Sequence, residues 1–455
     1  MRRRRAGVCI TRHGKRQDLT PARPLLEKGR AFFIPSTYTL MGLRKINTRH
    51  FHLATRSTAR DVNRQIVLNL IREHQPISRA ELARRMRVRR SALTTLVRDL
   101  VASGSVFEKG TAPTVRGRRP TLLFVQTRGR LAVAVDVRAV TTSIALADFS
   151  GRMLTREAFD TPSTPEALID ELASRLARIT PVRGDAIDHE EGCEGIGLVV
   201  PGMVDRRNGR ILYAPRLGWR DVDIRSALAG KLGLAVSVES APIACAMARL
   251  WLAPEATRVV RSFAYVSVSE GVGVGLVDNG EVLRGDAHTA GEFGHVSLDP
   301  NGPECVCGKR GCWEALVCNT ATVSRYVERV RGTREANDAL QLNGRRTLTI
   351  AEVVRRARRG EPAAVEAVAE TGRQIGRGLA AVVSAFNPGR VYLGGEITAA
   401  WEIIEPMIRQ SLVAETLTDA ARATPVVPDE NPAEYRLLGA VALVAAPAYA
   451  APNVG

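Results

Sequence analysis

One histidine and three cysteines between residues 295 and 312 constrain the fold of this chain more than any other feature. His295, Cys305, Cys307 and Cys312 are separated by glycine and charged residues rather than by a core pattern. One imidazole and three thiolates complete the tetrahedral shell that zinc prefers, and they leave no coordination position open. The alternative is three buried cysteines that pack as small apolar groups. We therefore expect a structural Zn²⁺ site, a zinc knuckle over residues 295–312.

The positive charge of the chain is concentrated at one end. Residues 1–130 hold 30 Lys and Arg against 7 Asp and Glu, whereas the remaining 325 residues hold 35 against 40. Neutralising backbone phosphates releases condensed counterions, so this asymmetry favours double-stranded DNA as a partner. The alternative is a solvated basic face without a partner.

Length and hydropathy narrow the class of protein further. A chain of 455 residues exceeds the usual size of one hydrophobic core, so more than one domain is expected. No apolar run approaches the ~20 residues that span a bilayer. Arg2–Arg5 are not followed by the apolar core of a signal peptide. We expect a cytoplasmic protein with no membrane partner.

The first 57 residues mix arginine runs with proline, glycine and histidine and show no sustained periodicity. That composition is typical of a basic, poorly ordered arm. Met41 would also serve as a start, so residues 1–40 are open to interpretation as a start-site artefact.

Residues 58–126 have the pattern of a winged helix-turn-helix. Helical spacing from Asp61 ends at Pro76, and Ser78 to Glu81 has the pattern of a capping box. A short helix follows, and a turn at 87–89 leads to a second helix over 90–103. We expect that second helix to bury Leu93, Leu96, Val97, Leu100 and Val101. Residues 105–108 and 122–125 then form a hairpin, the wing.

The outward face of the second helix carries residue types that contact bases and phosphates, not the Glu and Lys mixture of an idle surface. The alternative is a generic helical hairpin. Arg89 also occupies a position where a small capping residue would favour the helix by about 1 kcal/mol. The residues expected to contact DNA are Arg89, Arg90, Ser91, Thr94, Thr95 and Arg98, with Arg116, Arg118 and Arg119 in the wing loop.

From residue 127 to residue 450, strand and helix patterns alternate, which indicates an α/β architecture. The expected strands are 131–137, 142–149, 195–200, 236–239, 263–268 and 274–277, and the expected helices are 165–179, 363–385 and 399–413.

Two segments of this region resemble the signature of the ROK family (repressor, open reading frame, kinase). They are 290–295, AGEFGH, and 305–314, CVCGKRGCWE; supporting matches lie at 195–205, 212–215 and 387–395. The resemblance covers residues 61–450. It implies an actin-like ATPase fold, related to ribonuclease H, with two α/β lobes and a carbohydrate held in the cleft between them.

The resemblance also implies which residues hold the carbohydrate. Ionised carboxylates accept charge-assisted hydrogen bonds from sugar hydroxyls, and the motif histidine serves both sugar and metal. The alternative for the two motif glutamates is that they are solvated loop acids. The expected sugar-binding residues are Gly202, Glu239, Ser240, Glu292, His295 and Glu314.

Three departures from the family's kinases argue against phosphoryl transfer. The kinases carry Glu-Asn-Asp with a general-base aspartate, but here the stretch reads Glu239-Ser240-Ala241, and alanine accepts no proton. The two phosphate loops carry Arg138 and Glu270 where small residues let backbone amides approach phosphate. We expect no enzyme activity and assign no catalytic residue.

Together these features predict a sugar-responsive transcriptional repressor that acts as a homodimer or homotetramer, with ligand and DNA linked reciprocally. Two alternatives remain. One is an active kinase that phosphorylates a hexose or N-acetylhexosamine with ATP and carries an appended DNA-binding domain. The other is a DNA-binding protein whose kinase-like domain serves only for assembly.

Overall fold

The computed structural model describes residues 56–111, 119–127, 129–179, 192–252, 260, 262–331, 348–429 and 432–450. The basic arm expected over residues 1–57 therefore lies almost wholly outside the described residues, as does the second start at Met41.

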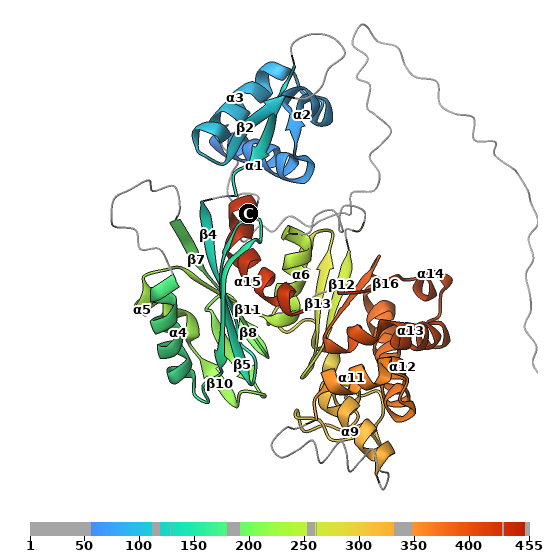
Figure 1. The fold of residues 1–455 in the computed structure, drawn as a ribbon. Helices are drawn as coiled ribbons and strands as arrows, with labels where there is room; N and C mark the ends of the chain where they lie inside the picture. Colours follow the sequence, from blue (N-terminus) through green and yellow to red (C-terminus); the bar gives the residue numbers. More distant parts are fainter. Residues whose placement is uncertain are drawn as a thin grey trace, which may run out of the picture. The chain divides into compact units, whose positions relative to one another are not determined.

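Residues 56–125 form three helices and a small sheet (Figure 1). The sheet is antiparallel in the order β1-β3-β2, and the sequence analysis missed its first strand because two residues show no periodicity. The elements are α1 (Arg56–His74), β1 (Ile77–Ser78), α2 (Arg79–Met86), α3 (Arg90–Ala102), β2 (Val106–Thr111) and β3 (Thr121–Val125).

Local sequence signals explain how these helices begin and end. The Ser78 hydroxyl accepts a hydrogen bond from the Glu81 amide at 3.2 Å and caps α2. Arg87 adopts a left-handed conformation, with φ 54°, and ends that helix. Leu93, Val97 and Leu100 are buried as expected. Val101, by contrast, is 37% exposed, because the residue after Leu100 points about 100° around the helix, away from the core.

The first α/β lobe is built on a five-stranded sheet in the order β11-β7-β4-β5-β6. A three-stranded antiparallel sheet, β10-β9-β8, is attached to it. Its elements are β4 (Arg130–Asp136), β5 (Thr141–Asp148), β6 (Met153–Asp160), α4 (Pro165–Ile179), β7 (Gly192–Val200), β8 (Met203–Asp205), β9 (Arg210–Ala214), β10 (Trp219–Val222), α5 (Ile224–Leu232), β11 (Val236–Ser240) and α6 (Ala241–Leu252).

The second lobe is built on a sheet in the order β14-β13-β12-β15-β16. Its strands are β12 (Phe263–Val268), β13 (Val272–Asp278), β14 (Glu281–Leu283), β15 (Val391–Gly394) and β16 (Val426–Pro428). Its helices are η1 (Glu292–His295), α8 (Trp313–Val317), α9 (Asn319–Val330), α11 (Ile350–Arg358), α12 (Pro362–Phe386), η2 (Glu396–Ala400), α13 (Trp401–Glu415) and α14 (Asp419–Arg422). The chain returns to the first lobe with α15 (Pro432–Tyr449).

The two five-stranded sheets share one topology. In each sheet, three consecutive strands pair antiparallel. A later strand then pairs parallel with the first of the three, and one further strand pairs parallel with that later strand. The same supersecondary unit therefore occurs twice. This confirms the predicted two-lobed α/β architecture.

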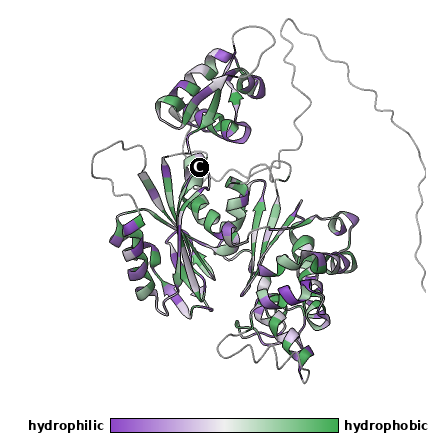
Figure 2. Cartoon of the chain, in the orientation of Figure 1, coloured by the Kyte–Doolittle hydropathy of each residue, from purple (hydrophilic) through white to green (hydrophobic). Residues whose placement is uncertain are grey.

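Alternation along β4 explains how the first lobe packs on both faces. Leu131, Val133 and Val135 join the core that includes α4 and α5, whereas Ala132 and Ala134 join the core that includes α6 and α15. Small residues on the second face let the helices approach closely. At Gly197 an added Cβ would lie 1.8 Å from the Ala440 carbonyl oxygen of α15. Figure 2 shows the hydrophobic residues gathered on the strands of both lobes.

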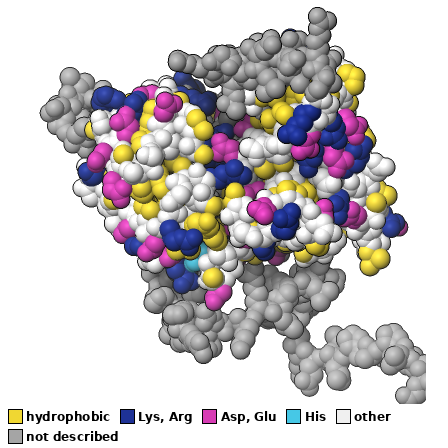
Figure 3. Space-filling view, turned by 90° about the horizontal axis from the view of Figure 1, so that it is seen from below, with side chains coloured by type: hydrophobic (Ala, Val, Ile, Leu, Met, Phe, Trp, Pro, Cys, Tyr) yellow, Lys and Arg dark blue, Asp and Glu magenta, His cyan; other side chains and the backbone are white. Residues whose placement is uncertain are grey.

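One face of the two lobes can be examined for charge. Figure 3 shows acidic and basic side chains interspersed on the face turned to the viewer, without a continuous patch of one sign. Within the described ranges, no helix combines the length and apolar composition that a membrane crossing requires.

Candidate ligand cleft and metal site

A cavity of about 280 Å³ lies between the two lobes. Turns at the ends of strands and the first residues of α6 and α8 form its wall, which is where α/β folds place their ligands. Residues of both lobes with polar or charged side chains line it, namely Arg138, Arg216, Ser240, Ser267, Ser269, Glu270, His288, Glu292, His295, Glu314 and Arg436.

Five of the six predicted sugar-binding residues line this cavity: Gly202, Ser240, Glu292, His295 and Glu314. Gly202 has φ +97°, and an added Cβ would lie 2.2 Å from the Tyr213 carbonyl oxygen, so the turn requires glycine. The sequence spacing alone could not show that residues 202 and 314 meet, because they belong to different lobes.

Glu239 does not line the cavity. Its side chain is buried, one carboxylate oxygen lies 3.1 Å from Arg284 Nη2, and the other accepts a hydrogen bond from the Ser240 amide at 3.0 Å. The expectation that Glu239 contacts a ligand is not supported by this placement. The ion pair with Arg284 occupies the carboxylate instead.

The two motif glutamates differ in their surroundings. Glu314 is buried, and its Oε2 accepts a hydrogen bond from the Val272 amide at 2.9 Å. Glu292 is solvent-accessible within the cleft, yet the protein atoms around it disfavour ionisation and raise its pKa. The charge of Glu314 raises that pKa further, while His295 opposes the shift. The charge of Glu314 thus acts on Glu292 across the cavity, and Glu314 itself is held by a backbone amide rather than freely solvated.

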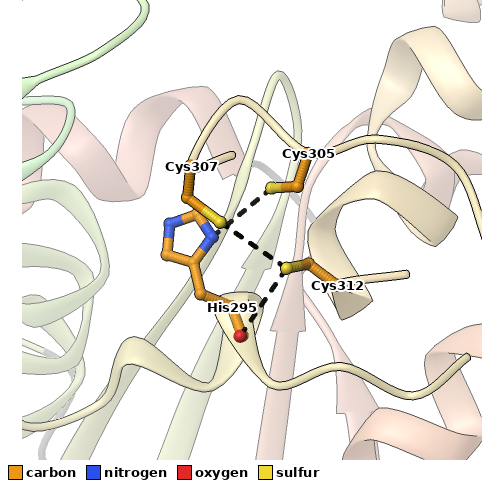
Figure 4. A group of neighbouring side chains, drawn as sticks. All are labelled: His295, Cys305, Cys307 and Cys312. Atoms are coloured by element: carbon orange, nitrogen blue, oxygen red, sulfur yellow. Dashed lines mark hydrogen bonds between the residues drawn. The ribbon is translucent and has the colours of Figure 1, made fainter. Parts of the chain in front are cut away.

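The predicted metal ligands come together in one cluster (Figure 4). The ligand atoms of His295, Cys305, Cys307 and Cys312 all lie within 4.8 Å of one another. His295 Nδ1 is 3.6 Å from Cys305 Sγ, and Cys307 Sγ is 3.6 Å from Cys312 Sγ. Tetrahedral sulfur ligands at about 2.3 Å from an ion are roughly 3.8 Å apart, so this arrangement could hold a metal ion.

Tight backbone turns and the second-lobe core hold the cluster in place. At Gly311, with φ +62°, an added Cβ would lie 1.5 Å from the Asp299 carbonyl oxygen. Trp313 follows the last cysteine, is buried, and donates its indole N–H to the Gln374 carbonyl oxygen at 3.0 Å. Burial, followed by hydrogen bonds with Cys307 and Cys305, raises the pKa of the Cys312 thiol to about 12. A bound cation would offset that shift, because thiolates are its ligands.

At the other end of the cavity, charged groups pair with one another. Asp136 is buried at the end of β4 and accepts hydrogen bonds from Arg436 Nε at 2.6 Å and Arg138 Nε at 3.0 Å. Arg138 also reaches the second lobe, where its Nη1 lies 3.4 Å from Glu396 Oε1. Asn319 donates to the other oxygen of Glu396 at 3.1 Å. The sequence analysis noted Arg138 for its bulk, but no motif indicated Arg436 or Glu396.

The residues expected to contact DNA fall into two groups. Arg89, Arg90, Ser91, Thr94, Thr95 and Arg98 are exposed on or beside α3, and Arg119 is exposed before β3. Arg116 and Arg118 lie outside the described residues. The Thr94 hydroxyl donates to the Arg90 carbonyl oxygen at 2.8 Å. Arg89 precedes α3 without a side-chain cap, as expected.

Comparison with known proteins gives the family. The ROK family model matches residues 132–446. The xylose repressor of Bacillus spizizenii is 27% identical over 368 residues, which cover 80% of this chain and 88% of that repressor. The DNA-binding transcriptional dual regulator NagC of Escherichia coli is 26% identical over 388 residues, with 85% and 92% covered.

Solved structures share the fold. A ROK family transcriptional regulator, a homolog of the E. coli MLC protein, matches with a TM-score of 0.70 and 24% identity over 86% of this chain and 97% of its own. A ROK family glucokinase from Streptomyces griseus, solved with glucose and AMPPNP, matches with a TM-score of 0.60 and 26% identity over 69% and 98%. Because the family model spans both lobes, including the His and Cys cluster of the second lobe, this chain belongs to the ROK family.

Proposed function

We propose that this protein is a sugar-responsive transcriptional repressor whose cleft binds a carbohydrate without phosphorylating it. One observation carries the proposal: the residues expected to hold the sugar line one cavity, while Arg138 and Arg436, which also line it, pair with Asp136. Glu292, Glu314, His295 and Ser240 line it, whereas Asp136 is paired with two arginines and Ala241 stands at the position of the kinase base.

The relatives that align over most of this chain support the regulatory part of the proposal, since one is a xylose repressor and another is NagC. The glucokinase structure has the same two-lobed fold, so the fold does not distinguish a kinase from a repressor. Loss of phosphoryl transfer therefore needs its own test. The cavity volume of about 280 Å³ is close to the lower end of the range for small-molecule sites, roughly 300 to 1,000 Å³.

Residues 58–126 are proposed to be the DNA-binding domain, a winged helix-turn-helix. Helix α3 would enter the major groove and present Arg90, Ser91, Thr95 and Arg98, with β2 and β3 forming the wing. The exposure of these side chains supports the assignment. A dimer or tetramer in the cytoplasm would then place two such domains on a two-fold operator.

Zn²⁺ is the metal proposed for the His295 cluster. Three thiolates and one imidazole prefer it over harder cations, and the complete shell implies a structural role. Because His295 also lines the cavity, the metal would orient a residue that faces the ligand.

The test begins with selection of a binding site from random duplex DNA by the purified full-length protein. Titration of that DNA with D-xylose, D-glucose and N-acetyl-D-glucosamine should weaken binding with one of them. Arg98→Ala should weaken DNA binding, and Arg156→Ala, an exposed arginine on β6, is the matched control. DNA affinity unchanged by a sugar that demonstrably binds would overturn the repressor mechanism, and phosphorylated sugar formed from ATP would favour the kinase alternative.

A further inference from the structure

His288 is the one histidine of the cleft that neither the sequence motifs nor the metal cluster uses. It lies in the loop between β14 and η1 and lines the same cavity as Glu292 and Glu314. Both of its ring nitrogens are buried, and neither has a hydrogen-bond partner within the described part of the chain. A buried polar group without a partner is disfavoured, and such groups in native structures call for an explanation. A ligand in the cavity would supply the partner.

The backbone conformation at His288 also supports a ligand contact. Its φ of 59° lies in the left-handed region, which residues other than glycine seldom adopt, although histidine does so more often than most. Positive φ also occurs at Asp221, Asn279 and Asn387, whose short polar side chains tolerate it, and at Arg87, which ends α2. Strained residues of this kind persist where the surrounding structure holds them, and they concentrate at ligand sites. The loop therefore keeps an unfavourable backbone conformation at a residue whose ring lies against the cavity.

His288 also lies where the two lobes face each other. The cavity that His288 lines is also lined by Met203 and Val204, which belong to β8 of the first lobe. A ligand that bonds the His288 ring would thus contact the second lobe at a point facing the first.

The chemistry of the cavity indicates which ligand groups suit this ring. A neutral imidazole offers one N–H donor and one acceptor, and a hydroxyl group can serve either. Two arginines that line the cavity, Arg138 and Arg436, pair with Asp136, while Arg216 lies 3.8 Å from Glu314 and its Nε has no partner among the described residues. The charge of Glu314 offsets that of Arg216, and Glu292 would repel an anionic ligand. A neutral polyhydroxy compound fits better.

We propose that His288 is a ligand-contacting specificity residue, whose two ring nitrogens hydrogen-bond hydroxyl groups of a neutral sugar and so select for a hydroxyl at one position of that sugar. This inference rests on the proposed function, because it takes the cavity to be a carbohydrate site. It adds a contact on the loop 284–291 to those expected from Glu292 and Glu314.

The test uses three variants of the full-length protein. His288→Gly removes the ring and accepts a φ of 59° without strain, His288→Phe keeps the ring size without nitrogens, and His288→Asn keeps hydrogen-bonding capacity. Asn279→Gly makes the same backbone change in the β13–β14 turn, away from the cavity, and is the matched control.

Calorimetric titration with D-xylose, D-glucose and N-acetyl-D-glucosamine identifies a sugar that binds the wild type, and its monodeoxy analogues are then compared. The wild type should disfavour one analogue by at least about tenfold, because removing a hydroxyl leaves the ring unpaired. His288→Gly and His288→Phe should bind the parent sugar at least about tenfold more weakly and lose that discrimination. His288→Asn should retain part of it.

Thermal unfolding separates binding from folding. His288→Gly should melt no lower than the wild type, because its backbone strain is relieved. The inference is overturned if His288→Gly and the wild type bind the parent sugar and every deoxy analogue alike while Glu292→Gln weakens binding. If the wild type binds none of the three sugars, the proposed function fails as well, and this inference falls with it.

Discussion

The two ends of the cleft are built from similar residues but use them in opposite ways. At one end Asp136, Arg138, Arg436 and Glu396 satisfy one another, and Arg138 links the two lobes through its ion pair with Glu396. At the other end Glu292, His288 and His295 line the cavity, and the two nitrogens of His288 have no partner in the described residues. Charged side chains of the same kinds can thus either pair with one another or remain available to a ligand.

This difference shows why the presence of a family residue does not establish its role. Asp136 matches the aspartate of the first phosphate loop in the family's kinases, but here its carboxylate pairs with the guanidinium groups of Arg138 and Arg436. Glu239 matches the first residue of the Glu-Asn-Asp stretch in the family's kinases, but it pairs with Arg284. Glu292 and Glu314 are retained and line the cavity. The following predictions test this contrast, beginning with the largest expected effect.

Loss of the metal should cause the largest change, because the cluster supports the open end of the cleft. Cys312→Ser removes a buried ligand, and we expect the free energy of unfolding to fall by upward of about 4 kcal/mol, the stabilisation that an ion gives at 1,000 times its Kd. Metal content by mass spectrometry and thermal unfolding measure this. Cys318→Ser, a buried cysteine outside the cluster, should retain the metal. Full stability of the chelated wild-type protein would contradict the prediction.

Disrupting the ion pairs of Asp136 should have the second largest effect on stability. Asp136→Asn leaves the enclosed Arg436 without its counter-charge, and we expect a loss of about 3 kcal/mol in the free energy of unfolding measured with urea. Asp221→Asn is the matched control, since Asp221 pairs with Arg210 at an exposed site and asparagine accepts its positive φ. Equal stability of the two variants would mean that the network at Asp136 is not structural.

Removing one carboxylate at the open end should act on binding rather than stability. Glu292→Gln is expected to weaken sugar binding about 10- to 100-fold, the effect of losing a hydrogen bond to a charged group. Glu304→Gln, an exposed acid in the 295–312 loop that pairs with Arg310, should bind like the wild type. Calorimetric titration distinguishes them, and identical affinities would remove Glu292 from the site.

The same residue should make binding depend on pH. The protein atoms around Glu292 disfavour its ionisation and raise its pKa, so its carboxylate is protonated at a higher pH than that of an ordinary glutamate. Sugar affinity should therefore be complete above that raised pKa and fall as the pH drops through it, because the protonated acid loses acceptor capacity. Glu292→Gln should abolish this dependence in titrations from pH 7 to pH 4.5. A wild-type profile that is flat over this range would contradict the prediction.

Restoring the missing base should have the smallest effect. Ala241→Asp supplies a carboxylate at the kinase position, but Arg138 and Arg436 still pair with Asp136, and Glu270 still faces the cavity. We expect no detectable phosphorylation of D-glucose with ATP and Mg²⁺ by the wild type or by this variant. Product formation by Ala241→Asp alone would show that the closed end still admits a nucleotide.

Local signals in the sequence determined several elements of this protein. The capping pattern at Ser78, the helical spacing of α3 and the compact spacing of His295 and the three cysteines each depend on residues near one another in the chain. The alanine at position 241, where the resemblance to the family's kinases places the base, could also be recognised, because a motif of three residues carries it. Such features need no knowledge of distant contacts.

Only the tertiary structure decided which charged side chains face the cavity and which pair with other side chains of the protein. Arg436 reaches Asp136 from 300 residues away, and Glu396 reaches Arg138 from 258 residues away. The pairing of Glu239 with Arg284 likewise depends on how distant segments pack, and so does the His288 ring, which has no partner among the residues that the structure describes. The physical reason is that a side chain's role follows from the partners within hydrogen-bonding distance, and the packing of distant segments of the lobes, not the order of the chain, selects them.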